Sequence, residues 1–253
     1  MNAQSAVTPF RWPDGRRAAV SLTFDDARAS QVETGLPILN RHGMKATFYV
    51  AVGNVEPRVA EWKAAVAAGH EIGNHTIRHP CSANFCWSRD NALEDYTLAD
   101  MEADILAAND RIKELLGVVP RTFAYPCGQT FVGRGAHCAS YVPVVAGRFL
   151  AGRGFHGETH NNPALCDLAQ LCGSAADGLS FDELRRLADH AAADGGWLVL
   201  CSHEVGADGG GQTTGAAVLD RLCEYAADAS RGLWVDTVAA VADYVDRCRG
   251  SEG

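Results

Sequence analysis

Short apolar runs recur along the chain, and stretches with the apolar spacing of helices separate them. The runs cover residues 18–24, 46–52, 71–74, 122–125, 198–202 and 233–235. Strands buried on both faces of a sheet have continuous apolar sequences, and their alternation with helices is typical of β/α units around a parallel sheet. The pattern therefore predicts an α/β fold with parallel strands and outer helices.

Two of the intervening helices begin with capping boxes. The stretches that start at Thr97 and at Ser180 each place an acidic residue three positions after the hydroxyl residue, so both side chains can bind amides that are free at a helix start. Gly117 and Gly195 are expected to end these helices. Further helices are expected over residues 57–68, 214–229 and 236–247.

Two parts of the chain depart from this regular alternation. Pro37 limits any helix across residues 31–42, because proline lacks the amide hydrogen that an interior helical position uses. Residues 152–178 have weak periodicity, and we expect an irregular loop there, with room for one short strand, on the substrate side. No linker stands out, so we expect three parts: an N-terminal extension (1–17), a single domain (18–248) and a tail (249–253).

Composition and charge exclude several classes of function. The 253 residues carry a net charge of −9 with no basic run, which argues against nucleic acid as a partner. No apolar stretch is long enough to span a membrane. Residues 1–15 show no secretory signal, which favours the cytoplasm, with an exported form whose signal has been removed as the alternative. Nine scattered cysteines fit reduced thiols better than a disulfide framework.

Residues that can carry chemistry follow directly on the predicted strands. Asp25-Asp26, His75, the turn over residues 125–128 and His203 each come immediately after an apolar run. In a parallel β/α barrel these strand ends converge on one face, where such barrels place their active sites. Four strand ends are therefore expected to bring their side chains to one place.

The histidines and the acidic pair both suit a metal ion. One turn of helix would place His75 and His79 on the same side, although a pair of surface histidines is the simpler alternative. Asp25 and Asp26 repel each other unless a cation lies beside them; the plain alternative is a helix cap with a solvated companion. With a metal present, one carboxylate can bind the ion while the other acts as a general base.

At these residues the chain resembles a known family. Thr23-Phe24-Asp25-Asp26 and His75-Thr76-Ile77-Arg78-His79 look like the first two motifs of the polysaccharide deacetylases, also called carbohydrate esterase family 4 or NodB-like deacetylases. Residues 46–50, 123–128 and 198–203 are similar to the family's second strand, third motif and last catalytic strand. The resemblance spans roughly residues 18–245.

The resemblance implies a distorted (β/α) barrel of the NodB-like type. It also implies a hydrolase that removes N- or O-acetyl groups from a carbohydrate by metal-activated water, with one divalent ion, zinc before cobalt or nickel. Asp26, His75 and His79 would bind the metal, Asp25 would be the base, and His203 would protonate the leaving group. The residues expected around the oxyanion and the substrate are Trp87, Tyr125, Pro126, Cys127, Arg153 and His160.

The chain also departs from the family pattern. Many members have Arg where this chain has Ala124, so the cation that orients the catalytic carboxylate must come from elsewhere; Arg121, Arg134 and Arg153 are candidates, and Arg153 is preferred. The Asp-x-x-Asp-Trp type motif that supports the catalytic histidine in many relatives is missing. Cys201 replaces an expected Leu, so the resemblance does not define the pocket for the acetyl methyl group.

Other functions stay open. A cytoplasmic relative could hydrolyse a small cyclic amide such as allantoin, or an ester of the acetylxylan type. His75 and His79 could instead join Cys81 and Cys86 in a closed zinc site of a non-catalytic binding module. A homo-oligomer is a further option that the sequence leaves undecided.

Three other features have simple interpretations. The second HxxxH pattern, from His156 to His160, could bind a metal but more simply lines the substrate cleft. Trp87 lies in a polar stretch and could stack on a sugar ring. Cys127 has no recognisable partner for activation, so a role as nucleophile is not expected.

Overall fold

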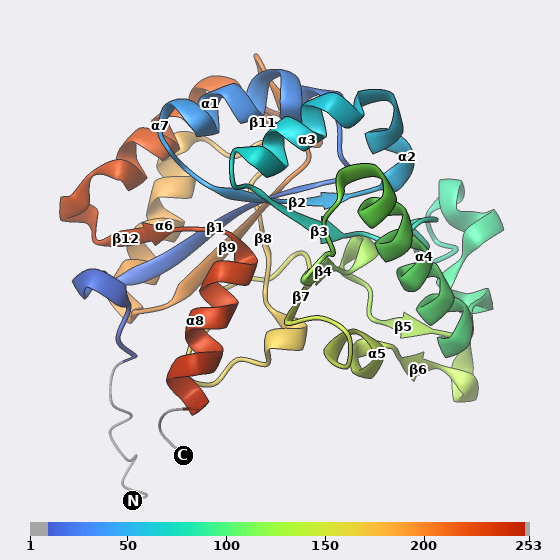
Figure 1. Ribbon diagram of the computed structural model, residues 1–253. Coiled ribbons are helices and arrows are strands. Elements are labelled where there is room, and N and C mark those ends of the chain that lie inside the picture. The colour runs from blue at the N-terminus through green and yellow to red at the C-terminus, as the bar shows by residue number, and fades with distance from the viewer. Residues whose placement is uncertain (1–9, 251–253) are drawn as a thin grey trace, which may run out of the picture.

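A curled parallel sheet forms the centre of the protein (Figure 1). The computed structural model describes residues 10–250, so most of the expected extension and the end of the expected tail lie outside the described residues. The strand order is β7-β4-β3-β2-β1-β9-β8, β12 pairs with the start of β1, and all these pairs are parallel. The expected parallel α/β architecture is confirmed. The strands of the sheet are β1 (Ala18–Asp25), β2 (Ala46–Val50), β3 (Glu71–Asn74), β4 (Thr122–Ala124), β7 (Ala151–Arg153), β8 (Ser174–Ala175), β9 (Trp197–Ser202) and β12 (Leu233–Val235).

Every predicted strand is present, although β2 ends early because Val52 begins a helix. The sequence does not predict β7 and β8, because neither strand contains an apolar run long enough to be recognised. The strand β8 corresponds to the one short strand that was considered possible within residues 152–178. Two small pairs lie off the main sheet: β5 (Phe131–Val132) with β6 (Ala139–Ser140), and β10 (Glu204–Gly206) with β11 (Thr213–Gly215).

Helices cover both sides of the sheet. Figure 1 shows α1, α3 and α7 on one side and α8 on the other. The helices are α1 (Leu36–Arg41), α2 (Val52–Val55), α3 (Val59–Ala67), α4 (Leu98–Leu116), α5 (Val142–Ala146), α6 (Phe181–Asp194), α7 (Ala216–Ala227) and α8 (Val238–Gly250). Both capping boxes form, and Gly117 and Gly195 end α4 and α6 in the left-handed conformation, with φ of 76° and 72°.

The limit expected from Pro37 was too strict. Residues 31–35 form a wide helical turn, and α1 follows with Pro37 in its first turn. An amide in the first turn of a helix has no partner within the helix, so proline is tolerated there.

The two faces of β1 lead to different parts of the protein. Ala18, Val20, Leu22 and Phe24 belong to the core cluster beneath the outer helices, whereas Ala19 belongs to the cluster that packs under α8. Side chains alternate along a strand. Asp25, at the carboxyl end of β1, therefore continues the inner face that starts at Ala19 and points into the curl of the sheet.

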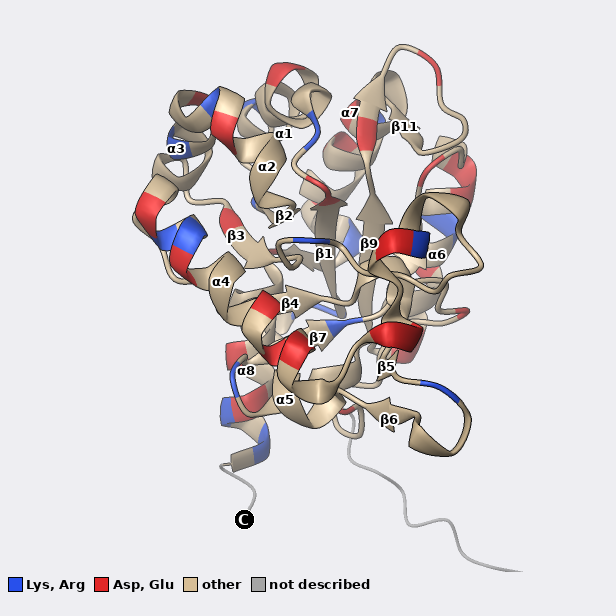
Figure 2. Cartoon of the chain, turned by 90° about the vertical axis from the view of Figure 1, so that its right-hand side faces the viewer, with Lys and Arg blue, Asp and Glu red and all other residues tan. Residues whose placement is uncertain are grey.

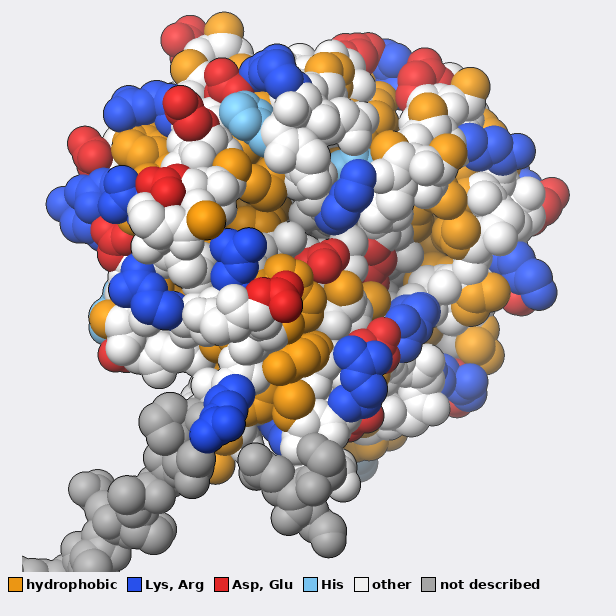
Figure 3. All heavy atoms as spheres, turned by 60° about the vertical axis from the view of Figure 1, so that its left-hand side comes forward, with side chains coloured by type: hydrophobic (Ala, Val, Ile, Leu, Met, Phe, Trp, Pro, Cys, Tyr) orange, Lys and Arg blue, Asp and Glu red, His pale blue; other side chains and the backbone are white. Residues whose placement is uncertain are grey.

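The surface carries charges of both signs. Acidic and basic side chains are interspersed over the outer helices in the cartoon of Figure 2 and over the face drawn in Figure 3. Among residues 10–250, no helix combines the length and the apolar character that a membrane crossing requires.

We expect Gly73→Ala to destabilise the fold. A Cβ at this position would lie 2.4 Å from two ring atoms of Tyr49, which is buried between β1 and β3. Overpacking of this kind costs about 1–3 kcal/mol. Thermal unfolding should show a clear fall in Tm for Gly73→Ala. The control is Gly53→Ala in α2, where a Cβ meets no atom within 4 Å; equal Tm values for both variants would contradict the packing argument.

Candidate active site

The carboxyl end of β1 directs two adjacent carboxylates to different partners. Asp25 is the last residue of the strand, and Asp26 adopts a left-handed conformation with φ of 72° while its amide donates to the carbonyl of Tyr49 over 2.9 Å. Asp26 turns toward His75 and His79, and Asp25 pairs with Arg153. The two repelling charges are thus separated by backbone conformation and by different neighbours.

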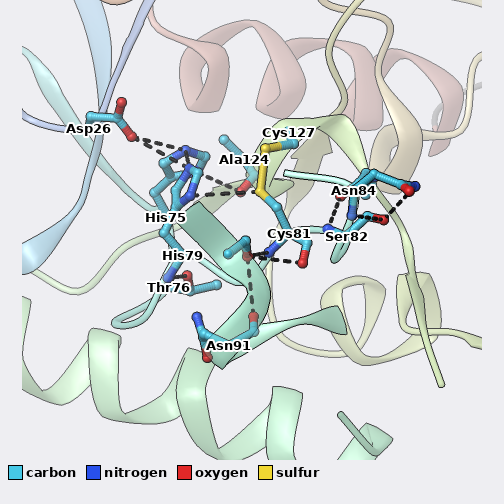
Figure 4. Close-up of a disulfide and its surroundings, with 12 residues drawn as sticks. Asp26, His75, Thr76, His79, Cys81, Ser82, Asn84, Asn91, Ala124 and Cys127 are labelled. Carbon is cyan, nitrogen blue, oxygen red and sulfur yellow. Dashed lines mark hydrogen bonds and ion pairs between the residues drawn. A yellow bond between two sulfur atoms is a disulfide. The ribbon is translucent and has the colours of Figure 1, made fainter. Parts of the chain in front are cut away.

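Asp26, His75 and His79 converge on one point (Figure 4). The two Nε2 atoms are 3.1 Å apart, and Asp26 Oδ1 lies 3.6 Å from each of them. Zinc bonds to nitrogen and oxygen measure about 2.0–2.2 Å, so ligand atoms around a tetrahedral ion lie about 3.3–3.6 Å apart. The two Asp26–histidine distances lie in this range and the Nε2–Nε2 distance of 3.1 Å lies slightly below it. Together with the donor set of two nitrogens and one oxygen, this spacing fits a divalent ion with open coordination positions.

A loop, rather than the expected turn of helix, brings the two histidines together. Thr76 and His79 have φ of 65° and 51°, values outside the right-handed helical region. Asp104 of α4 accepts hydrogen bonds from the amides of Ile77 and Arg78 at 2.6 and 3.2 Å and holds the loop in this shape. The helical explanation of the HxxxH spacing was therefore wrong. The feature of the sequence that could have indicated this contact is the acidic residue Asp104 on the buried face of α4.

The surroundings favour the ligand forms of these side chains. His75 Nδ1 lies 2.9 Å from the carbonyl oxygen of Ala124, which leaves Nε2 facing the site. Burial and the neighbouring His75 lower the pKa of His79 to about 4, so its imidazole is neutral near pH 7, as metal binding requires. Burial alone would raise the pKa of Asp26, but the two histidines and Arg28 outweigh it and lower that pKa.

Arg28 is a site residue that the sequence analysis missed. Its guanidinium donates to Asp26 Oδ2 over 2.9 Å, and the other carboxylate oxygen, Oδ1, remains directed at the histidines. Glu204 also pairs with the Arg28 guanidinium, at 3.4 Å. Arg28 therefore orients the carboxylate of Asp26, and no spacing rule pointed to it.

Arg153 supplies the positive charge beside Asp25, because Ala124 stands where many family members have Arg. Ala124 and Arg153 are direct partners in the pairing of β4 with β7, so the guanidinium reaches Asp25 from the neighbouring strand. Arg153 is fully buried and also lies over the ring of Tyr49. It does not line the cavity, so its placement among residues that touch the substrate was wrong. The other two candidates, Arg121 and Arg134, form exposed ion pairs elsewhere.

His203 is held by a partner that the sequence analysis did not find. Asp177, two residues after the end of β8, places Oδ2 2.7 Å from His203 Nδ1 and accepts a hydrogen bond from the backbone amide of His203 over 3.2 Å. Burial alone would lower the pKa of His203, but the contacts with Asp177 and Asp25 raise it. The sequence did not indicate this role, because Asp177 is an acidic residue next to a glycine after a strand of only two residues.

A disulfide joins the histidine loop to the turn after β4. Cys81 and Cys127 are bonded, with Cα atoms 6.2 Å apart, so the expectation of reduced thiols is wrong for this pair (Figure 4). Disulfides are typical of oxidising compartments. The cytoplasmic location stays a prediction, and this bond is a reason to test it. Since its sulfur is used, Cys127 is not a free nucleophile.

The bond also contradicts the closed zinc site of a binding module. The sulfur of Cys81 is occupied, and Cys86 is an exposed free thiol that joins none of the metal-capable clusters found among residues 10–250. His75 and His79 therefore meet Asp26 instead of two thiolates.

A cavity of about 490 Å³ opens over these groups. Trp87 stands at its rim, 59% exposed, with Phe85 beside it at 5.3 Å between ring centroids. Tyr125 lines the cavity, but its hydroxyl donates to the buried carbonyl of Ala169, and Pro126 is buried beneath. The residues that line the cavity are Asp25, Asp26, Arg28, His75, His79, Phe85, Trp87, Tyr125, Cys127, Phe155, His156, His203 and Gln212.

The second HxxxH pattern is divided between two places. His156 lines the cavity, whereas His160 lies at the amino end of β9 beside Asp194. His160 therefore does not touch a substrate in this cavity, contrary to expectation, and the two histidines share no metal site.

Comparison with known proteins agrees with this geometry. Residues 7–132 match the family model described as polysaccharide deacetylase. The chain belongs to the polysaccharide deacetylase family. A putative polysaccharide deacetylase from Mycobacterium smegmatis has the same fold, with a TM-score of 0.69 and 16% identity over 97% of this chain and 96% of that one.

Curated relatives of this deacetylase-family chain match over shorter stretches. The peptidoglycan-N-acetylglucosamine deacetylase PgdA of Listeria monocytogenes is 30% identical over 43% of this chain and 21% of its own length. The chitooligosaccharide deacetylase of Sinorhizobium fredii is 35% identical over 38% of this chain and 40% of its own. An uncharacterized protein of Bacillus subtilis, YlxY, is 35% identical over 27% of its own length. The chain thus spans less than half the length of these relatives.

We expect loss of the disulfide to destabilise this family member. The double variant Cys81→Ser/Cys127→Ser removes a bond between residues 46 positions apart, and bonds of this kind contribute about 2–4 kcal/mol. Thermal unfolding should show a lower Tm for the double variant than for wild type, and wild type in reductant should show the same lower Tm. Cys86→Ser/Cys138→Ser, which changes two exposed free thiols, is the control; the same Tm in both double variants would show that the bond does not stabilise the fold.

Proposed function

We propose that this protein removes N- or O-acetyl groups from an acetylated carbohydrate with one bound divalent metal ion. The observation that carries the proposal is that the adjacent residues Asp25 and Asp26 have different partners. One carboxylate joins two histidines at ligand spacing, and the other pairs with a buried arginine beside the same cavity. Deacylation needs a Lewis acid, a base and an acid together, and this cavity offers ligands for a metal ion and one residue for each of the other two tasks.

Asp26, His75 and His79 would hold the ion. Zinc suits two imidazoles and a carboxylate, and cobalt is compatible with the same donors. When bound, the ion supplies a Lewis acid that activates water and polarises an acyl carbonyl. Support for this step comes from the spacing of the three side chains and from an acetyl xylan esterase of the same fold from Clostridium thermocellum, which was solved in complex with cobalt.

Asp25 would accept the proton of the attacking water. Its ion pair with Arg153 fixes the position of the carboxylate beside the cavity. His203 would donate a proton to the departing amine or alcohol, because its bond to Asp177 favours the imidazolium form. The first amides of a helical turn have no partner within the turn, so the Cys127 amide can donate to the developing oxyanion.

The cavity rim and the relatives both favour a sugar substrate. Phe85 and Trp87 present exposed aromatic faces next to His79, and pyranose rings pack on such surfaces. The curated relatives named above carry the names of deacetylases of peptidoglycan N-acetylglucosamine and chitooligosaccharides. An acetylated amino sugar is therefore the first substrate class to test.

The decisive experiment measures acetate and zinc together. Wild type should release acetate from a panel of acetylated chitooligosaccharides and acetylxylan, and Asp25→Asn should lose activity by about 10²–10⁴-fold, the scale of a missing acid–base group, while it retains zinc. Asp243→Asn, at an exposed ion pair, is the control. Circular dichroism checks the fold, because Asp25→Asn leaves Arg153 without its charged partner.

Two results would contradict the proposal. Acetate release by Asp25→Asn at the wild-type rate would remove Asp25 from the chemistry. Opening of allantoin by the wild-type protein without acetate from any sugar would replace the deacetylase with an amidohydrolase of small cyclic amides.

The pH profile tests the role of His203. An acid must be protonated, so kcat/KM falls as pH rises through the pKa of His203. Asp177→Asn removes the contact that raises this pKa, and the alkaline limb of the profile should move to lower pH. Asp208→Asn, in the exposed loop after β10, should leave the limb in place. An alkaline limb that stays at the same pH in Asp177→Asn would exclude His203 as the titrating acid.

A further inference from the structure

A second group of metal-capable side chains lies at the opposite end of β9 from His203. His160, His190 and Asp194 each offer one ligand atom, and these atoms lie within 4.8 Å of one another. His203 follows the carboxyl end of β9, and this group borders its amino end. The six-residue strand spans roughly 20 Å at about 3.3 Å per residue, so the group is separate from the cavity described above.

The contact distances suit a shared ion better than direct hydrogen bonds. Asp194 Oδ2 lies 3.4 Å from His160 Nε2 and 3.3 Å from His190 Nε2. A charged His–Asp hydrogen bond measures about 2.7–2.9 Å, whereas two ligands of a tetrahedral zinc ion lie about 3.3–3.6 Å apart for bonds of about 2.0–2.2 Å. Both distances agree with the spacing of zinc ligands. The donor set of two imidazoles and one carboxylate also suits zinc.

The backbone holds each ligand in place. His190 and Asp194 are four residues apart in α6, on the same side of the helix. His160 precedes Asn161, which exchanges two backbone hydrogen bonds with Trp197 at 2.8 and 2.9 Å. The ring of His160 packs against Gly196, where a Cβ would lie 2.1 Å from the ring. Glycine at this position therefore makes the room that His160 occupies.

Charge also favours a cation here. Asp194 is the last residue of α6, where the negative end of the helix dipole disfavours a carboxylate, and no basic residue occupies the last turn.

We propose that His160, His190 and Asp194 form a second site for a divalent transition metal, zinc in the first place, that fastens the segment before β8 to α6. The ion would have three protein ligands and a position open to water. Because His160 belongs to the irregular segment and the other two ligands belong to a regular helix, binding links a loop to a rigid element and stabilises the folded state.

Zinc stoichiometry after dialysis tests this site independently of the proposed function. Wild type should retain about two ions per chain, and Asp26→Ala and His190→Ala about one each, with none in the double variant. His137→Ala, at an exposed histidine that joins none of the metal-capable clusters among residues 10–250, is the control and should retain the wild-type content.

A second measurement follows stability. In the Asp26→Ala background zinc should raise Tm, and adding His190→Ala or Asp194→Asn should abolish that rise. Wild-type zinc content in His190→Ala, or a zinc-dependent Tm that survives both substitutions, would overturn the second site. Wild-type zinc content in Asp26→Ala would instead overturn the metal site of the proposed function, so the two failures are distinguishable.

Discussion

The candidate active site depends on keeping two adjacent carboxylates apart. Asp25 and Asp26 would repel each other if both faced the same volume, and neither could then have a defined role. A left-handed residue at Asp26 turns its side chain toward the histidines, while Arg153 holds Asp25 within the curl of the sheet. The backbone thus directs one carboxylate to the two histidines and the other to the buried arginine, as the proposed roles of metal ligand and base require.

The rest of the fold supplies the partners that make this separation stable. The pairing of β4 with β7 places Arg153 where Ala124 has no charge to offer, and Asp104 of α4 shapes the loop between His75 and His79. The disulfide between Cys81 and Cys127 ties that loop to the next strand end. These contacts come from segments far apart in the sequence, so the site is assembled only when these segments come together in the folded protein.

The sequence was informative where a side chain had to follow a strand. Apolar runs located the strands around the site, and Asp25, Asp26, His75 and His203 follow them directly, so their convergence could be predicted from a parallel sheet alone. The partners that orient these side chains could not be predicted in this way. The positions of Asp177 and Arg28 follow no periodic pattern in the sequence. Their roles depend on loops that contain residues in the left-handed conformation, and helix and strand propensities do not predict where such residues occur.

The most direct test of this account is anomalous diffraction from zinc-loaded crystals of the protein. The account predicts an anomalous peak about 2.0–2.2 Å from Asp26 Oδ1 and from Nε2 of both His75 and His79, with Asp25 paired to Arg153 and outside the coordination sphere. A peak that Asp25 coordinates, or no peak between Asp26 and the two histidines, would contradict the division between the two carboxylates.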